Sequence, residues 1–131
     1  MIKKESPSAD EWLREAKNDP SSVNCGMYLF HNGVVRQTAK AAVRNGEKDT
    51  EPVVSMDFTY DKEKVNEAVK ETLKLNGIFY VKTWLNEGRL SVGDDIMMVL
   101  IGGDIRPNVV DALQFLVDKL KNECVSEKEI Y

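Results

Sequence analysis

The stretch "IFYVKTWLNEGRLSVGDDIMMVLIGG", residues 78–103, decides the fold class of this chain. Residues 78–85 and 95–103 are apolar, aromatic and β-branched runs, which is the composition of β-strands. The polar residues between them contain Gly88 and Gly93 and show no helical pattern, although a short piece of strand is expected at Arg89-Leu90. Because no helix separates the two strands, the sequence predicts antiparallel pairing.

Two long amphipathic helices are expected on either side of this stretch. Residues 61–77, "DKEKVNEAVKETLKLNG", end at an Asn-Gly stop signal, and residues 106–121, "RPNVVDALQFLVDKLK", place Pro107 at the first helical position. The expected core stripe of the first helix is Val65, Ala68, Val69 and Leu73. That of the second is Val109, Leu113, Leu116, Val117 and Leu120.

The first part of the chain predicts one more helix and two more strands. Ser8 and Glu11 have the spacing of a capping box before a helix that ends at Asp19-Pro20. Residues 25–37, "CGMYLFHNGVVRQ", indicate a strand in which Asn32-Gly33 is either a hairpin turn or a bulge. Residues 53–60, "VVSMDFTY", alternate as a half-buried strand does.

Residues 37–52 between these two strands indicate a long polar loop, which we expect to be mobile without a partner. The predicted element order is therefore α, β, β, α, β, β, α. This is a single α+β domain over residues 1–131, with a mainly antiparallel sheet, two long helices and an N-terminal helix.

Composition excludes several classes of protein. The formal net charge of −4 argues against general nucleic-acid binding, which depends on neutralising phosphates. No apolar run is long enough to span a bilayer, and no signal peptide is visible, so we expect a cytoplasmic protein. Cys25 and Cys124 form no metal-binding pattern, and His31 is the only histidine, so neither a metal nor another cofactor is expected.

Polar motifs offer few candidates for chemistry. No P-loop, dinucleotide-binding glycine pattern or nucleophile elbow is present. Asp94-Asp95 is interpreted as an exposed turn, and His31 as a packing or surface residue. The remaining candidates are cations from separate segments: Arg36, Lys40, Arg44, Arg106, Lys121 and Lys128. If they converge, they can bind an anion.

Three motifs in order resemble the large, catalytic subunit of molybdopterin synthase. They are "GMYLFHNGVVR", "NEGRLSVGDD" and "VGDDIMMVLIGGDIR" followed by "ALQFLVDKLK" and "EKE", and the similarity covers about residues 25–131. The interval from Arg106 to Lys121 and Lys128 is similar to that of the family's arginine and two lysines. The resemblance also favours a continuous, bulged strand at Asn32-Gly33.

The resemblance implies an α/β hammerhead-type fold and a homodimer that becomes a heterotetramer with a small ubiquitin-like sulfur carrier. It implies transfer of sulfur from the carrier's C-terminal thiocarboxylate to cyclic pyranopterin monophosphate, which forms the dithiolene of molybdopterin. Lys121 and Lys128 are then the expected catalytic residues, and Arg36 and Arg106 the expected substrate-binding residues, all in one anionic-ligand pocket.

The chain also departs from the family pattern. Leu85-Asn86 replaces a usual His-Arg, Ile105 a usual His, and Val125, Ser126 and Glu127 stand where a proline and an aromatic are usual. The chain also stops at Tyr131, short of the family's usual C-terminal tail. An alternative therefore stays open, in which the chain is a non-catalytic dimeric relative that keeps the fold and binds a ubiquitin-like or other protein partner.

Overall fold

The structure is a computed structural model that describes residues 2–40, 46 and 51–131. Its described helices are α1 (Ala9–Asn18), α3 (Lys62–Leu73) and α4 (Arg106–Lys119), with a 3₁₀ turn η1 (Pro20–Asn24) and a π-helical turn η2 (Leu120–Cys124). Its strands are β1 (Met27–Val34), β2 (Ser55–Tyr60), β3 (Ile78–Leu85), β4 (Gly88–Ser91), β5 (Asp95–Gly103) and β6 (Val125–Ile130). Most of the predicted 37–52 loop lies outside the described residues.

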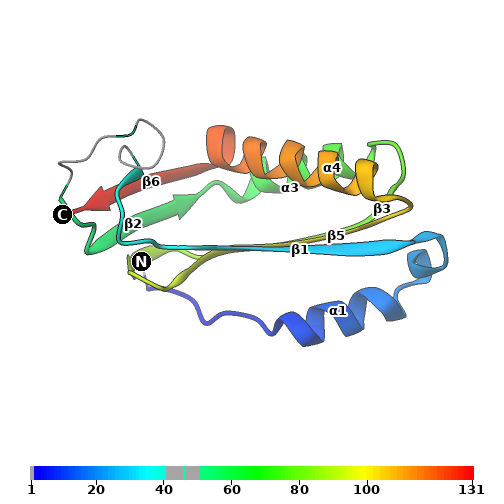
Figure 1. The fold of residues 1–131 in the computed structure, drawn as a ribbon, viewed down its shortest axis with the longest axis horizontal. Helices are drawn as coiled ribbons and strands as arrows, with labels where there is room; N and C mark the ends of the chain where they lie inside the picture. Colours follow the sequence, from blue (N-terminus) through cyan, green and yellow to red (C-terminus); the bar gives the residue numbers. More distant parts are fainter. Residues whose placement is uncertain (1, 41–45, 47–50) are drawn as a thin grey trace.

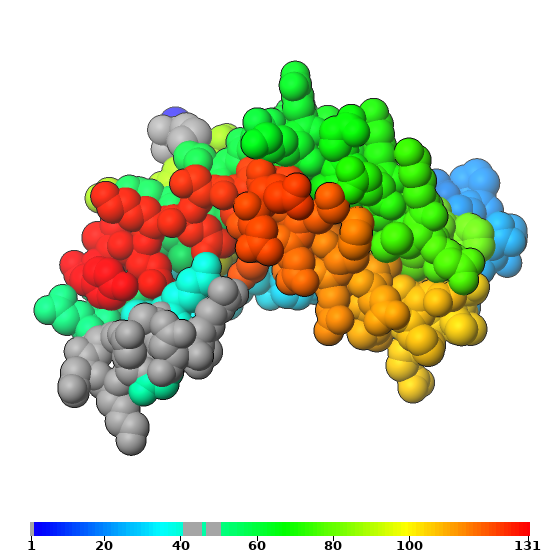
Figure 2. All heavy atoms as spheres, turned by 90° about the horizontal axis from the view of Figure 1, so that it is seen from above, coloured from blue at the N-terminus to red at the C-terminus, as the bar shows by residue number. Residues whose placement is uncertain are grey.

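The strands form two three-stranded antiparallel sheets, in the orders β1-β5-β3 and β4-β2-β6. Helix α1 lies against one face of the first sheet, and α3 and α4 lie side by side over the other face (Figure 1 and Figure 2). The second sheet continues the layer of α3 and α4 at one end of the molecule (Figure 1). The predicted α+β class, with antiparallel pairing and three helices, is confirmed.

The central strand β5 has the main core on one side and a smaller apolar cluster on the other. Met97, Val99 and Ile101 pack with residues of α3 and α4, and Met98 and Leu100 pack with Trp12 of α1. Every residue from Ile96 to Gly103 is buried within the one chain. The apolar character of this strand had favoured a dimer, but the chain's own helices cover both of its faces, so that reason does not hold.

Local signals explain most element boundaries. The Glu11 backbone N–H donates to Ser8 Oγ at 3.3 Å, which confirms the predicted N-cap of α1. Strand β1 runs without a turn through Asn32-Gly33, and its register shifts between Gly33 and Val34, as a bulge requires. The hairpin alternative is therefore excluded, and the strand ends at Val34, two residues before Arg36.

The core stripe of α3 differs in part from its prediction. Val65 and Ala68 are buried as expected, but Thr72 is buried and Leu73 is 41% exposed. The Thr72 hydroxyl donates to the Ala68 carbonyl at 2.8 Å, so the buried hydroxyl has a hydrogen-bond partner. A satisfied threonine can therefore occupy a position where apolar periodicity predicts leucine.

Strand β6 was not predicted. Its sequence "VSEKEI" contains three charged residues and lacks the apolar alternation of a typical strand. It forms because its backbone pairs antiparallel with β2, from Tyr60 opposite Val125 to Ser55 opposite Ile130. This strand carries Lys128 and decides which side chains near the chain's end meet the predicted site.

Candidate functional site

A hollow of about 220 Å³ lies where the end of β1, the turn η2 and strand β6 come together. Its apolar lining comes from Gly33, Val34, Met56, Ile96 and Met97. Its polar lining consists of His31, Arg36, Lys40, Lys121, Glu127 and Glu129. Three cations therefore face two carboxylates here, and the described lining has a formal excess of one positive charge.

Two of the four predicted site residues line this hollow. Arg36 follows β1, and its Nε donates to the Thr38 carbonyl at 3.0 Å, which orients the exposed guanidinium. Lys121 lies in η2, directly after α4, and is partly buried. Within the described part of the chain, Lys121 has neither an ion-pair nor a hydrogen-bond partner, so its charge is available to a ligand.

The other two predicted residues lie elsewhere in the chain. In β6, Glu127 and Glu129 line the hollow, whereas Lys128 between them is exposed, because neighbouring side chains of a strand point to opposite faces. Arg106 is exposed at the first residue of α4, roughly 20 Å along the helix axis from Lys121. One chain therefore does not bring Arg36, Arg106, Lys121 and Lys128 into one pocket.

Sequence reasoning missed the acidic side of the hollow. Lys40 Nζ lies 3.5 Å from Glu127 Oε2, and the Lys40 backbone N–H donates to Glu129 Oε2 at 3.0 Å. The Tyr131 hydroxyl donates to Glu129 Oε1 at 3.3 Å. Only the pairing of β6 with β2 brings these carboxylates to the cations, and no local sequence signal shows that pairing.

Two buried side-chain atoms in this hollow have no hydrogen-bond partner among the described residues: His31 Nε2 and Glu127 Oε1. Burial, and secondly the positive charge of Lys121, lower the pKa of His31 below its ordinary value. The imidazole is therefore neutral at pH 7. The hollow can bind an anion through Arg36 and Lys121, and it also presents unused hydrogen-bonding atoms beside them.

The first comparison concerns protein families. A model of the family described as MoaE protein matches residues 2–123, which is nearly the whole chain.

The chain belongs to the MoaE family.

Solved structures agree with this family at the level of the fold. A molybdopterin synthase from Staphylococcus aureus is 17% identical with a TM-score of 0.72, and the match covers 96% of this chain and 87% of that one. A molybdopterin biosynthesis MoaE protein from Burkholderia ambifaria is 17% identical with a TM-score of 0.72, and 97% and 84% are covered. No curated protein matched the sequence.

A third related structure contains two different proteins. It is a protein–protein complex of subunits 1 and 2 of the molybdopterin-converting factor from Helicobacter pylori. The matched chain is 14% identical with a TM-score of 0.63, and the match covers 96% of this chain and 84% of that one. At these identities the structures establish the fold that this chain shares with MoaE proteins.

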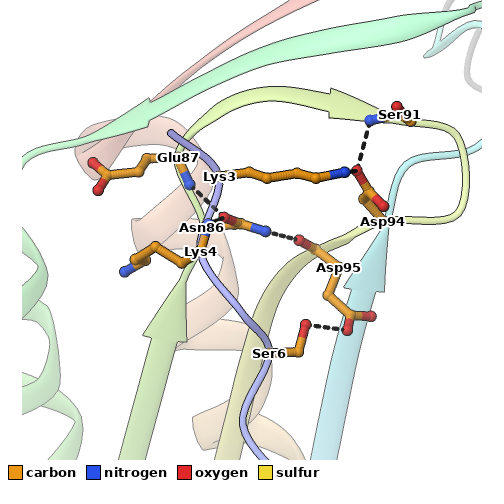
Figure 3. A network of polar contacts seen from close by, with 8 residues as sticks. All are labelled: Lys3, Lys4, Ser6, Asn86, Glu87, Ser91, Asp94 and Asp95. Carbon is orange, nitrogen blue, oxygen red and sulfur yellow. Dashed lines mark hydrogen bonds and ion pairs between the residues drawn. The ribbon is translucent and has the colours of Figure 1, made fainter. Parts of the chain in front are cut away.

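Asn86, one of the departures from the MoaE pattern, has a structural role here. It is 2% exposed, its Oδ1 accepts from the Lys4 backbone N–H at 2.7 Å, and its Nδ2 donates to the Asp95 carbonyl at 2.8 Å. Figure 3 shows Asn86 between the N-terminal segment and the start of β5. The amide therefore ties residues 3–6 to the sheet. Ile105, another departure, is 56% exposed at the N-cap of α4.

Asp94 and Asp95 hold the same N-terminal segment. Lys3 Nζ lies 2.9 Å from Asp94 Oδ2, and Ser6 Oγ donates to Asp95 Oδ2 at 2.6 Å (Figure 3). The hydrogen bond from Lys3 lowers the pKa of Asp94 below its ordinary value, and the Ser91 backbone N–H adds to this effect. Both carboxylates thus serve a structural contact, although the sequence had indicated a simple exposed turn.

A second, larger hollow of about 820 Å³ lies between α3 and the end of α4. Its central cation, Lys119, forms ion pairs with Glu71 at 2.7 Å and Glu123 at 3.6 Å. Cys124 borders it as a free thiol, and burial raises the pKa of that thiol, which keeps it protonated. Because its charges satisfy one another, this hollow is a weaker candidate site than the first. None of the described helices has the length and apolar character needed to cross a membrane.

Proposed function

We propose that this chain is the large, catalytic subunit of a molybdopterin synthase. In this reaction sulfur passes from the C-terminal thiocarboxylate of a small ubiquitin-like carrier to cyclic pyranopterin monophosphate. Membership of the MoaE family supports the pathway. The observation that carries the chemistry is the hollow in which Arg36 and Lys121 stand together.

The charges of the hollow suit two anionic reactants. The pterin substrate carries a phosphate, which a guanidinium such as that of Arg36 can bind through two hydrogen bonds. Release of the carrier passes through an oxyanion at its terminal carbonyl carbon, and a fixed cation such as Lys121 stabilises that charge. Arg36 is therefore assigned to the phosphate and Lys121 to the carrier's terminal acyl group.

The size of the hollow supports a protein partner. Its volume of about 220 Å³ is below the roughly 300–1,000 Å³ typical of sites that enclose a small molecule. A bound pterin phosphate would therefore extend beyond the rim, where a docked carrier can cover it. A complex of two subunits in the related Helicobacter pylori factor is consistent with such a partner.

Arg106 and Lys128 take part in this proposal through other surfaces. Because Arg106 is roughly 20 Å from Lys121 along α4, it can reach a hollow of this kind only from a second copy of the chain. A homodimer would supply that copy. Lys128 lies on the opposite face of β6 from the hollow, so its proposed catalytic role requires a local rearrangement of the strand when substrate or carrier binds.

The test is single-turnover conversion of cyclic pyranopterin monophosphate with a thiocarboxylated carrier. Lys121→Ala is expected to lower the rate by about 10²–10³ because a preorganised charge next to the reacting carbonyl is lost. Lys62→Ala, an exposed lysine at the start of α3, is the matched control and should keep the wild-type rate. A Lys121→Ala rate equal to wild type would remove Lys121 from the mechanism.

The placement of Lys128 favours a second candidate function, a non-catalytic MoaE relative that binds a ubiquitin-like partner. Here β6 turns the lysine away from the hollow and turns Glu127 and Glu129 toward it. The same assay separates the two functions. A wild-type chain that binds the carrier and produces no dithiolene would support the non-catalytic relative.

A further inference from the structure

Two buried atoms in the hollow require a physical explanation. Glu127 Oε1 and His31 Nε2 are both buried without a partner among the described residues, and the Glu127 side chain is only 14% exposed. Leaving a buried polar group unsatisfied costs about 1–3 kcal/mol, and more when the group is charged. Native structures keep such groups mainly where a ligand completes them.

The position of Glu127 gives the chemistry of the missing partner. One of its oxygens faces Lys40 Nζ at 3.5 Å, while the other is the unpartnered atom of the described hollow and can only accept a hydrogen bond. The neighbouring Glu129 differs, because the Lys40 backbone and the Tyr131 hydroxyl already donate to it. The hollow therefore has one satisfied carboxylate and one that requires an additional donor.

We infer that the hollow selects an anion that also carries N–H donors, with Glu127 Oε1 and His31 Nε2 as the acceptors for those donors. Arg36 and Lys121 bind the anionic group, and Glu127 is the residue that determines specificity. This inference rests on the proposed function. The 2-amino-4-oxo ring of cyclic pyranopterin monophosphate presents an amino group and a ring N–H, and the same molecule carries the phosphate.

The substitution Glu127→Gln tests this pairing because Lys40 limits how the new amide can be oriented. Lys40 Nζ can only donate, so the amide oxygen of the introduced side chain faces Lys40 and its NH₂ occupies the place of Oε1. That NH₂ would oppose an N–H donor of the ligand. Glu129→Gln is the matched control, since it removes the same charge from the same strand face.

A model that considers charge alone makes the opposite prediction. Removing either carboxylate makes the hollow more positive, so any anion should then bind equally well or more tightly to both variants. Only recognition of N–H donors by Glu127 predicts weaker binding of the pterin to one variant. The sign of the change therefore distinguishes recognition from general electrostatics.

The experiment is isothermal titration of wild type, Glu127→Gln and Glu129→Gln with two probes, cyclic pyranopterin monophosphate and inorganic phosphate. We expect Glu127→Gln to bind the pterin about tenfold more weakly and to bind phosphate as well as wild type or better. Glu129→Gln should bind both probes at least as well as wild type. His31→Phe, which leaves the charge of the hollow unchanged at pH 7, should weaken only the pterin.

Two results would overturn the inference, and they can be told apart. If wild type binds both probes and Glu127→Gln keeps full affinity for the pterin, donor recognition by Glu127 is wrong while the proposed function stands. If wild type binds phosphate and not the pterin, the proposed function fails and the inference fails with it. Thermal unfolding of each variant confirms that its fold is retained, and His31→Phe provides an independent test.

Discussion

At the scale of the residue, His31 reports directly on the hollow. It is the only histidine of the chain, and it lies on β1 with Lys121 of η2 near enough to act on its charge. Burial contributes most to its lowered pKa, and the charge of Lys121 contributes next. The other charged groups around this hollow are Arg36, Lys40, Glu127 and Glu129. A change in any of these charges should appear in the titration of His31.

We predict that NMR titration of the single histidine will give a pKa below 6.5. Lys121→Met should raise that pKa, because a positive charge that disfavours the imidazolium is removed. Bound phosphate should raise it as well, for the same electrostatic reason. Lys119→Met, in the other hollow, is the control and should leave it unchanged. An ordinary histidine pKa that does not respond to Lys121→Met would contradict this environment.

The sign of the effect on stability follows from the same shift. The folded state disfavours protonation of His31, so the unfolded state binds more protons in the range between the two pKa values. The contribution of His31 to stability is complete above pH 6.5 and is lost as the pH falls through the lower, folded-state pKa. His31→Phe should therefore make the free energy of unfolding less dependent on pH in this range.

At the scale of the element, the N-terminal segment is held by side chains far from it in the sequence. Besides its contacts to Lys4 and Asp95, Asn86 Oδ1 accepts from the Glu87 backbone N–H at 2.9 Å, and the Asn86 backbone N–H donates to the Ile96 carbonyl at 2.9 Å. One buried amide therefore joins the N-terminal segment, the end of β3 and the start of β5.

We predict that Asn86→Ala lowers the free energy of unfolding by about 2–3 kcal/mol, because several hydrogen bonds to one buried amide are lost together. Asn122→Ala, at an exposed position of η2, should change it by less than about 0.5 kcal/mol. Urea unfolding followed by circular dichroism measures both. Equal stabilities of the two variants would show that Asn86 does not hold the N-terminal segment.

At the scale of the whole molecule, the surface that a second copy would use is not the face of β5. Both faces of that strand are covered by α1 and by α3 and α4 of the same chain (Figure 1). Among the described strands, β1, β3, β4 and β6 are the edge strands of the two sheets. Edge strands offer backbone groups that can pair with another chain.

We predict a homodimer in solution, since the family resemblance implies one and Arg106 can join the hollow only from a second copy. Multi-angle light scattering at micromolar concentration should give twice the mass of 14.8 kDa. Adding a ubiquitin-like carrier should increase the mass by two carriers per dimer. A single-chain mass at every concentration would refute the dimer and leave Arg106 outside any hollow.

Local sequence was sufficient for the elements whose signals are local. The Ser8 cap and Pro107 at the start of α4 mark helix ends through backbone geometry and hydrogen bonding to nearby residues. The run from 95 to 103 is apolar without alternation, which correctly indicated a strand. These signals, together with the order of the elements, predicted the α+β class, and the cationic residues pointed to Arg36 and Lys121.

The tertiary structure alone decided the acidic half of the hollow. Strand β6 has almost no apolar pattern and forms through pairing with β2, which lies far away along the chain. That pairing turns Glu127 and Glu129 toward the cations and Lys128 away, because a strand alternates its side chains and a slip of one residue would reverse them. The sequence therefore determined which charged residues this protein carries, while long-range backbone pairing determined which of them face one another.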